Sequence, residues 1–118
     1  MKIMLNPKRV PELRRKLMDK LMEMFETDTT FEYREIEHCK KNGEVDSIEK
    51  TFVMTTGGKE TSVKKNDFLA KTELARVFHL EPGKECKKFV DRLENRGTTT
   101  LADLVEILIK TKVHIHKN

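Results

Sequence analysis

Apolar residues recur at three- and four-residue spacing near the start of the chain. From Leu13 to Phe25 they form a stripe about four turns long, and two prolines precede it, at Pro7 and Pro11. Proline suits the first turn of a helix because its missing N–H would have no partner there. The pattern therefore predicts an amphipathic helix that begins near Pro11 and ends near Thr27.

The period then changes from helical to alternating. Residues 31–34 alternate between apolar and charged side chains, and residues 48–55 form a second alternating run. Asn42-Gly43 between these runs is typical of a type I′ hairpin, because both central positions of that turn need positive φ. Gly57-Gly58 marks a second tight turn, after which residues 59–65 return as a third strand. These signals predict a three-stranded antiparallel meander.

The rest of the chain is predicted to be helical. Thr72 is placed to cap a helix over residues 73–79, which ends at the Leu80–Gly83 break because proline disfavours a helical residue before it. Residues 84–95 carry an apolar stripe at helical spacing, and Gly97 follows them where a left-handed cap belongs.

A last helix is predicted from residue 100 onwards. Thr100 and Asp103 have the spacing of a capping box, and Leu101, Leu104 and Leu108 follow on one face. The alternating residues 113–116 allow one more strand. Together these elements predict an α+β fold: an N-terminal helix, a three-stranded antiparallel meander, and three C-terminal helices packed on one face of the sheet.

Composition narrows the class of protein. The 118 residues show no linker, repeat or low-complexity tract, so a single domain over residues 1–118 is expected. The cysteines Cys39 and Cys86 stand alone without a CxxC pair, which favours free thiols in a reducing compartment. No signal peptide opens the chain and no apolar run approaches the roughly 18 residues of a membrane span. We expect an intracellular protein (cytoplasm, nucleoid or nucleus) that does not bind membranes.

No group of residues points to catalysis. A Cys86–His79 nucleophilic pair lacks a third group to orient it, and Gly57-Gly58-Lys59 lacks the spacing of a phosphate-binding loop. The ligand types for zinc are present, but Cys86 lies on the apolar stripe of a helix, and adjacent His38 and Cys39 point to opposite faces of a strand. The candidate ligands are His38, Cys39, Cys86, His114 and His116. We therefore expect no enzymatic activity, no metal and no cofactor.

One segment, Thr72 to Gly97, carries the clearest functional pattern. Glu73-Leu74-Ala75 is followed by an apolar turn at Leu80–Gly83 and by a helix ending in Arg92–Gly97, Arg-Leu-Glu-Asn-Arg-Gly. This order resembles the helix-turn-helix core of winged-helix DNA-binding proteins. The resemblance covers 26 of 118 residues, and a predicted helix stands where that family has its wing. It implies a second helix that enters a DNA groove, although two amphipathic helices joined by a turn are also a common way to bury a core.

Basic side chains outside the apolar stripes are the candidates for phosphate contacts. Lysine and arginine total 24 against 20 aspartate and glutamate, and the resulting net charge of +4 permits phosphate binding without requiring it. The first candidates belong to the second helix of the resemblance and its end: Lys84, Lys87, Lys88, Arg92 and Arg96. Secondary candidates are Lys59, Lys64 and Lys65 on the third strand and Arg14 and Arg15 on the first helix.

A second similarity concerns RNA. The order helix, three-stranded meander, helix is similar to that of double-stranded-RNA-binding domains, and Lys64-Lys65 with Ala70-Lys71 is similar to their lysine cluster at a helix start. That similarity implies phosphate contacts from these lysines, but the Gly-Pro-x-His loop of the family is missing. We favour DNA over RNA and a small DNA-binding regulatory factor as the function.

A protein-interaction or inhibitor module is the alternative hypothesis. Residues 8–20 have a balance of +4 and residues 23–37 a balance of −5, so opposed patches could meet another protein or a second copy of the chain. The first helix also carries Met18, Met22 and Met24, whose flexible side chains suit an adaptable apolar face and a homodimer.

Overall fold

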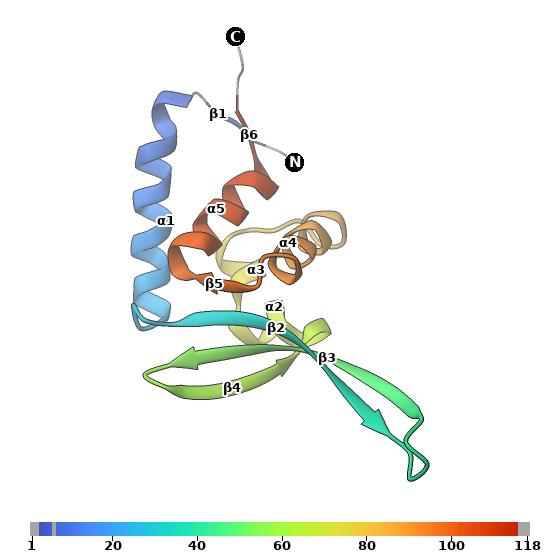
Figure 1. Cartoon of the computed structure of the whole chain (residues 1–118). Coiled ribbons are helices and arrows are strands. Elements are labelled where there is room, and N and C mark those ends of the chain that lie inside the picture. The colour runs from blue at the N-terminus through green and yellow to red at the C-terminus, as the bar shows by residue number, and fades with distance from the viewer. Residues whose placement is uncertain (1–2, 6, 116–118) are drawn as a thin grey trace.

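The computed structural model describes residues 3–5 and 7–115, and it has an α+β fold. A four-stranded antiparallel sheet forms one layer, and the helices cover one of its faces (Figure 1). Two short strands, β1 (Ile3–Leu5) and β6 (Val113–Ile115), pair in parallel on the far side of the helices and bring the ends of the chain together. The molecule is elongated, with extents of 59 × 31 × 22 Å.

The main sheet has the strand order β4-β3-β2-β5. The strands are β2 (Thr30–Cys39), β3 (Val45–Thr56), β4 (Lys59–Lys64) and β5 (Thr98–Thr100). Three antiparallel strands joined by hairpins were predicted, and β2, β3 and β4 form them. The fourth strand was not predicted: β5 pairs with the first residues of β2, from Thr30↔Thr100 to Glu32↔Thr98.

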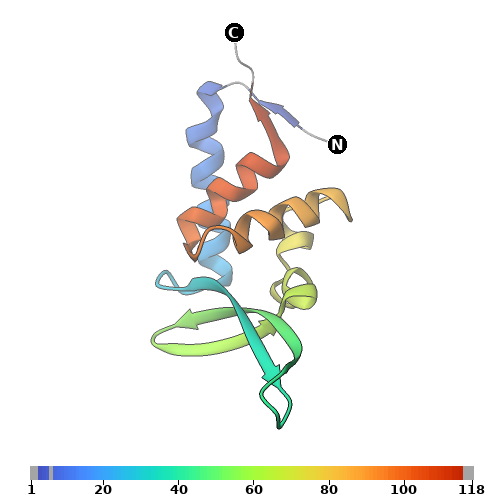
Figure 2. The same ribbon diagram turned by 45° about the vertical axis from the view of Figure 1, so that its right-hand side comes forward.

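One α-helix precedes the main sheet in the sequence, three lie between β4 and β5, and one follows β5. They are α1 (Val10–Met24), α2 (Phe68–Thr72), α3 (Leu74–Val77), α4 (Lys84–Glu94) and α5 (Leu101–Lys112), with 3-10 turns at Pro7–Arg9 and Lys65–Asp67. Helix α5 lies between α1 and α4 and contacts both (Figure 2). The apolar stripe predicted on the first helix faces this layer, where Leu21 is completely buried.

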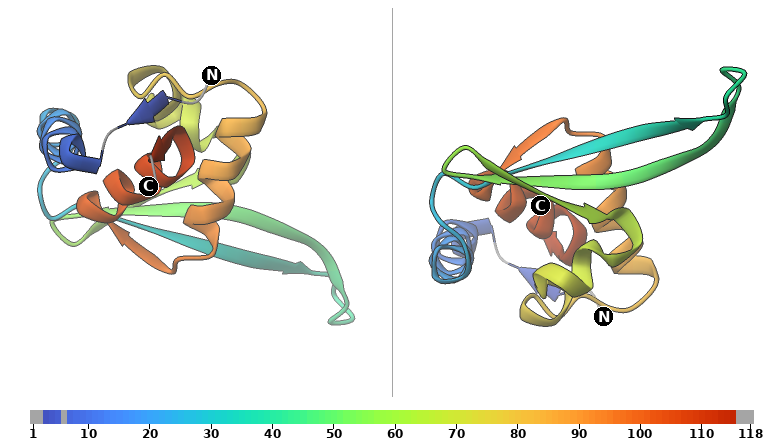
Figure 3. Two further views of the ribbon diagram at one scale, coloured as in Figure 1. Left: turned by 90° about the horizontal axis from the view of Figure 1, so that it is seen from above. Right: turned by 90° about the horizontal axis from the view of Figure 1, so that it is seen from below.

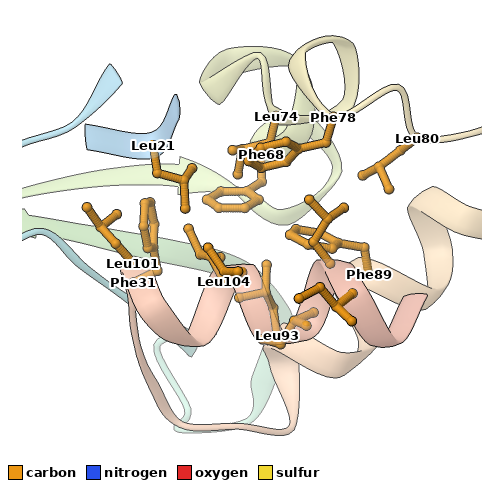
Figure 4. Packing of buried hydrophobic residues seen from close by; sticks show 14 of the residues in the cluster. Leu21, Phe31, Phe68, Leu74, Phe78, Leu80, Phe89, Leu93, Leu101 and Leu104 are labelled. Carbon is orange, nitrogen blue, oxygen red and sulfur yellow. The ribbon is translucent and has the colours of Figure 1, made fainter. Parts of the chain in front are cut away.

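The core forms where the sheet meets the helices. Phe31 and Phe52 point from β2 and β3 towards Phe68, whose ring centroid lies 5.7 Å from that of Phe31 and 4.5 Å from that of Phe52. Figure 4 shows side chains of three helices packed around Phe31 and Phe68: Leu21 of α1, Phe89 and Leu93 of α4, and Leu101 and Leu104 of α5. Full burial of one such side chain stabilises the fold by about 1.5–3 kcal/mol.

The sheet face away from the helices is polar. There Arg34 of β2 lies between two carboxylates, 3.2 Å from Glu32 and 3.1 Å from Glu60 of β4. This small network joins the first and last strands of the meander across β3, and it leaves the outer face of the sheet with paired charges.

The helix predicted over residues 73–79 is present but shorter, as α3 over Leu74–Val77. Glu73, with φ of 61°, ends a further short helix, α2, that was not predicted, so four helices follow the meander instead of three. The Thr72 hydroxyl donates to the carbonyl of Phe68 at 2.7 Å and accepts the N–H of Leu74 at 3.5 Å, so it connects the end of α2 to the start of α3. A left-handed non-glycine residue costs about 1 kcal/mol or more, which the buried Leu74 beside it offsets.

The type I′ turn predicted at Asn42-Gly43 is also wrong. Only Gly43 has positive φ there, at 88°, and the loop is longer, with the Lys40 N–H donating to the Glu44 carbonyl. The Asn42 side chain accepts the N–H of Glu44 at 3.0 Å, which stabilises this longer turn. At Gly57-Gly58 both residues have positive φ, so the second tight turn is confirmed.

The capping box predicted at the last helix is confirmed. The N–H of Asp103 donates to the Thr100 hydroxyl at 3.2 Å, and the N–H of Thr100 donates to the Asp103 carboxylate at 3.0 Å. Gly97 has φ of 82°, as a left-handed position requires, and it turns the chain from α4 into β5.

The outer halves of β2 and β3 leave the body of the molecule. Residues 35–50, called the arm from here on, form a twisted two-stranded ribbon that extends beyond the helices (Figure 3). Ile36, Val45 and Ile48 are large apolar side chains on the arm, and each is more than two fifths exposed.

Candidate nucleic-acid interface

Helix α4 presents a basic ridge to solvent. Its inner side buries Phe89 and Leu93, while Lys84 and Lys87 are exposed and Lys88 is half-buried. The apolar stripe that predicted this helix therefore also fixes which lysines face outwards.

Ion pairs neutralise part of this basic surface. Lys87 lies 3.0 Å from Asp91 one turn on, and Arg96 lies 2.6 Å from Asp103 of α5. The N–H of Thr100 and then the Arg96 guanidinium hold the pKa of Asp103 below its ordinary value, so this carboxylate stays charged. By contrast, Lys84 and Arg92 have no acidic partner within the described part of the chain.

A shallow groove of about 320 Å³ separates α4 from α5. It is lined by Arg92, Asn95, Arg96, Ile107 and Lys110. Arg92 and Lys110 approach it from the two helices, and neither has an ion-pair partner among residues 8–112. Two unneutralised cations with an amide donor beside them form a surface that suits a phosphate group. We call this the α4–α5 groove.

A second groove, of about 360 Å³, lies on the other side of α4. Its lining is Lys65, Asn66, Leu69, Cys86, Lys87, Val90 and Asp91. The Lys65 ammonium is fixed there, 2.6 Å from the Glu94 carboxylate and 5.7 Å from the centroid of the Tyr33 ring. Burial, followed by the charge of Glu85, raises the pKa of the Cys86 thiol. A thiol held in its protonated form is a poor nucleophile, so this groove has no activated cysteine.

One charged pair lies under the start of α4. Glu85 is 4% exposed, and its carboxylate accepts the N–H of Glu81 at 2.6 Å and lies 3.3 Å from the Lys112 ammonium of α5. Burial opposes its ionisation, but the Glu81 N–H and Lys112 outweigh burial and hold the pKa of Glu85 below its ordinary value. The Lys112 ammonium also donates to the carbonyl of His79. This pair joins the turn before α4 to the end of α5.

The ten predicted basic residues do not form one surface. Arg14 on α1 is paired with Glu106 of α5 at 2.5 Å, and α5 separates α1 from α4 (Figure 1). Arg15 is exposed on α1, Lys59 follows the tight turn between β3 and β4, and Lys64 ends β4. The structure thus brings Arg92 and Arg96 together with Lys110 in the α4–α5 groove and places Lys65 and Lys87 in the groove on the other side of α4. The α1 residues and Lys59 lie elsewhere.

Lys110 is the site residue that sequence reasoning missed. It lies in the last turn of α5, where the helical period marks it as exposed. Its position beside Arg92 depends on how α5 packs against α4, and helical spacing within one segment carries no information on such packing.

The methionines of α1 are not equally available to a partner. Met18 and Met24 are partly buried and pack against the core, while Met22 is 43% exposed. An adaptable apolar face on this helix would therefore depend mainly on Met22.

The described residues indicate neither a metal site nor a membrane-spanning helix. Between residues 8 and 112, no group of three His, Cys, Asp or Glu side chains could hold a metal ion. The side chains of His114 and His116, which the sequence offered as zinc ligands, lie outside the described side chains. No helix in the described ranges is long and apolar enough to cross a membrane. No family model, curated protein or solved structure matches this chain.

Proposed function

We propose that this protein is a non-catalytic, intracellular nucleic-acid-binding protein that uses the outer surface of α4 and the α4–α5 groove. One observation supports this above all: Arg92 and Lys110 converge on the groove without an acidic partner in the described part of the chain. Two neighbouring cations of this surface are already neutralised, Lys87 by Asp91 and Arg96 by Asp103. Two cations left unneutralised in a concave surface would gain most from an external anion.

The arrangement suits a polyanion more than a small ligand. The groove is open, and the exposed Lys84 continues the basic surface along the ridge of α4. Phosphates in the groove would fix the position of a strand, and Lys84 and Lys87 on the ridge would face the bases or the next phosphates. A helix presented in this way fits the major groove of DNA, so we propose duplex DNA as the partner and a regulatory role.

A salt titration tests the proposal directly. Fluorescence anisotropy should show binding to duplex DNA that weakens with salt, with a log–log slope near −0.9 for each neutralised phosphate. Duplex RNA and single strands serve as competitors and should displace DNA less well. Absence of binding to every one of these nucleic acids at about 50 mM salt, where such contacts are strongest, would refute the proposal.

Matched variants locate the surface. The double variant Arg92→Ala/Lys110→Ala should weaken binding and reduce the salt slope by up to about two units. Arg15→Ala/Lys59→Ala removes the same charge from residues away from the groove and should change binding far less. Equal losses in both variants would show that net charge, and not the α4–α5 groove, governs binding.

A further inference from the structure

The arm leaves two strand edges open. β4 pairs with β3 only over residues 51–56, and β5 pairs with β2 only over residues 30–32. Within the described ranges, the β3 edge over residues 45–50 and the β2 edge over residues 33–39 therefore have no neighbouring strand. Open edges that carry exposed apolar side chains favour pairing with another strand.

The β3 edge is complementary to itself. If a two-fold axis passes beside Ile48, antiparallel pairing places Ile48 opposite Ile48 of the second copy. Asp46 then lies opposite Lys50 of the second copy, and Lys50 opposite its Asp46. Because opposite residues in an antiparallel pair point to the same face about 5 Å apart, this register forms two salt bridges on either side of an apolar contact. Ile48 is 50% exposed in the single chain, so the contact would cover it.

The β2 edge lacks this complementarity. Antiparallel self-pairing centred on Ile36 places Glu35 opposite Glu37 of the second copy, and it does so twice. Like charges directly opposite each other destabilise a strand pair. The two edges of one ribbon thus differ: pairing between copies is favoured at β3 and opposed at β2.

A basic cleft lies where the open edge of β3 ends. It has a volume of about 580 Å³, and its lining holds Lys50, Lys64 and Lys65 against the two carboxylates Glu49 and Asp67, beside Ile48 and Asn66. Lys50 and Lys64 have no acidic partner among residues 8–112. In the register centred on Ile48, Asp46 of the second copy lies opposite Lys50, which lines this cleft. A lysine that is unpaired in the single chain would therefore gain a carboxylate partner from the second copy.

From these observations we propose that two copies of the chain associate edge to edge through residues 46–50 of β3. The contact is isologous, since the same segment serves on both copies, and it joins the two sheets into one continuous antiparallel sheet. The segment is short, so the interface is smaller than a standard stable one and the dimer is weak and concentration-dependent.

Charge exchange tests the register, in the absence of nucleic acid. Sedimentation equilibrium between about 10 µM and 1 mM should show a monomer–dimer equilibrium for the unmodified protein. Asp46→Lys should be monomeric because lysine then faces Lys50, and Lys50→Asp should be monomeric because aspartate then faces Asp46. The double variant Asp46→Lys/Lys50→Asp should dimerise again. A mixture of the two single variants should form heterodimers, since each supplies the charge that the other lacks.

A disulfide trap captures a weak dimer directly. In a Cys39→Ser/Cys86→Ala background, Ile48→Cys places the two new thiols opposite each other, within the 4.4–6.8 Å Cα separation that a disulfide needs. Mild oxidation should cross-link it at least tenfold faster than Ile36→Cys, the matched control on the other edge, where the native side chain is 43% exposed. Circular dichroism confirms that both variants are folded.

Three results would overturn the proposal. The first is a protein that is monomeric at every concentration and shows no preferential Ile48→Cys cross-link, and the second is faster cross-linking at Ile36→Cys. The third is a dimerisation constant that is the same in the unmodified protein and in the single charge variants. Arg92→Ala/Lys110→Ala should dimerise like the unmodified protein, because the groove lies away from this edge. Failure of DNA binding and failure of dimerisation are thus separate outcomes.

Discussion

The inner and outer halves of the β2–β3 ribbon share one hydrogen-bonded ladder but differ in how deeply their side chains are buried. In the inner half, Phe31 and Phe52 are each 1% exposed beneath the helices. On the arm, Ile36 and Ile48 are 43% and 50% exposed, with no helix over them. Strand pairing is the same in both halves, so the burial of side chains, and not the ladder, makes the inner half the stable one. An isolated two-stranded ribbon is marginally stable in water for this reason.

Pairs of ionisable side chains show the same contrast. The side chains of Glu85 and Lys112 in the body are 5% and 16% exposed, whereas those of Glu49 and His38 on the arm are 37% and 53% exposed. An exposed pair contributes about 0–1 kcal/mol, while removal of one partner from a buried pair leaves the other charge uncompensated. Equivalent substitutions in body and arm should therefore have very different effects.

The largest difference is expected for apolar truncation. Phe52→Ala should lower the free energy of unfolding by about 3–5 kcal/mol, because it removes a buried ring and leaves a cavity. Ile48→Ala on the arm should change it by less than about 0.5 kcal/mol. Chemical denaturation at a concentration that keeps the protein monomeric measures both. A loss above about 1 kcal/mol in Ile48→Ala would show that the arm is packed in the monomer.

The next effect depends on pH. Glu85→Gln should cost about 1–3 kcal/mol near neutral pH, since Lys112 loses its carboxylate partner. The pKa of Glu85 is lower in the folded state than its ordinary value of 4.5, so its stabilising contribution is complete above pH 4.5 and is lost as the pH falls below it. The gap in melting temperature between the two proteins should therefore narrow on acidification. Glu49→Gln on the arm is the matched control and should show no comparable gap.

A smaller effect is expected at the capping box. Thr100→Ala removes the hydroxyl that accepts the N–H of Asp103 and should cost about 1 kcal/mol. Thr100→Ser keeps the hydroxyl and should retain most of the stability. Urea denaturation distinguishes the two, and equal stabilities of the Ala and Ser variants would show that the cap contributes nothing.

The smallest effect is expected when the end of the arm is removed. Glu37 and Ile48 lie opposite each other in the ladder, so an Asn-Gly turn can replace residues 38–47 and close a two-residue hairpin. Unfolding of the shortened protein should remain cooperative, with a free energy within about 1 kcal/mol of the original. A protein that unfolds without a cooperative transition would show that the body needs the arm.

Sequence patterns predicted which helices and strands this fold contains better than they predicted where each element ends or which strand it pairs with. The first helix, the meander and the Thr100 capping box are local features, set by periodicity and by short-range hydrogen bonds. The break at Glu73 is different, because only the burial of Leu74 and its neighbours makes a left-handed glutamate acceptable. β5 has three threonines and no alternation of polarity, so nothing within it indicates that β2 would be its partner.

The sequence predicted exposed side chains on α4, but not which residues of other helices would join them in the candidate site. The stripe of α4 indicated that Lys84 would be exposed, since that side chain lies away from the buried face. It did not indicate that Lys110 would complete the α4–α5 groove or that Glu85 would be buried. Glu85 belongs to a charge-rich run, and its burial follows from the approach of Lys112 from a helix that lies much later in the chain.

The pairing of β5 with β2 also bears on how the protein is made. The two strands lie about seventy residues apart, so the meander can form on the ribosome long before its fourth strand and last helix emerge. Until then Phe31 lacks the cover that Leu101 of α5 provides (Figure 4). A nascent chain halted at Gly97 would carry an exposed aromatic face beside an open strand edge. Such an intermediate would be prone to aggregate, and synthesis of β5 and α5 would bury this face.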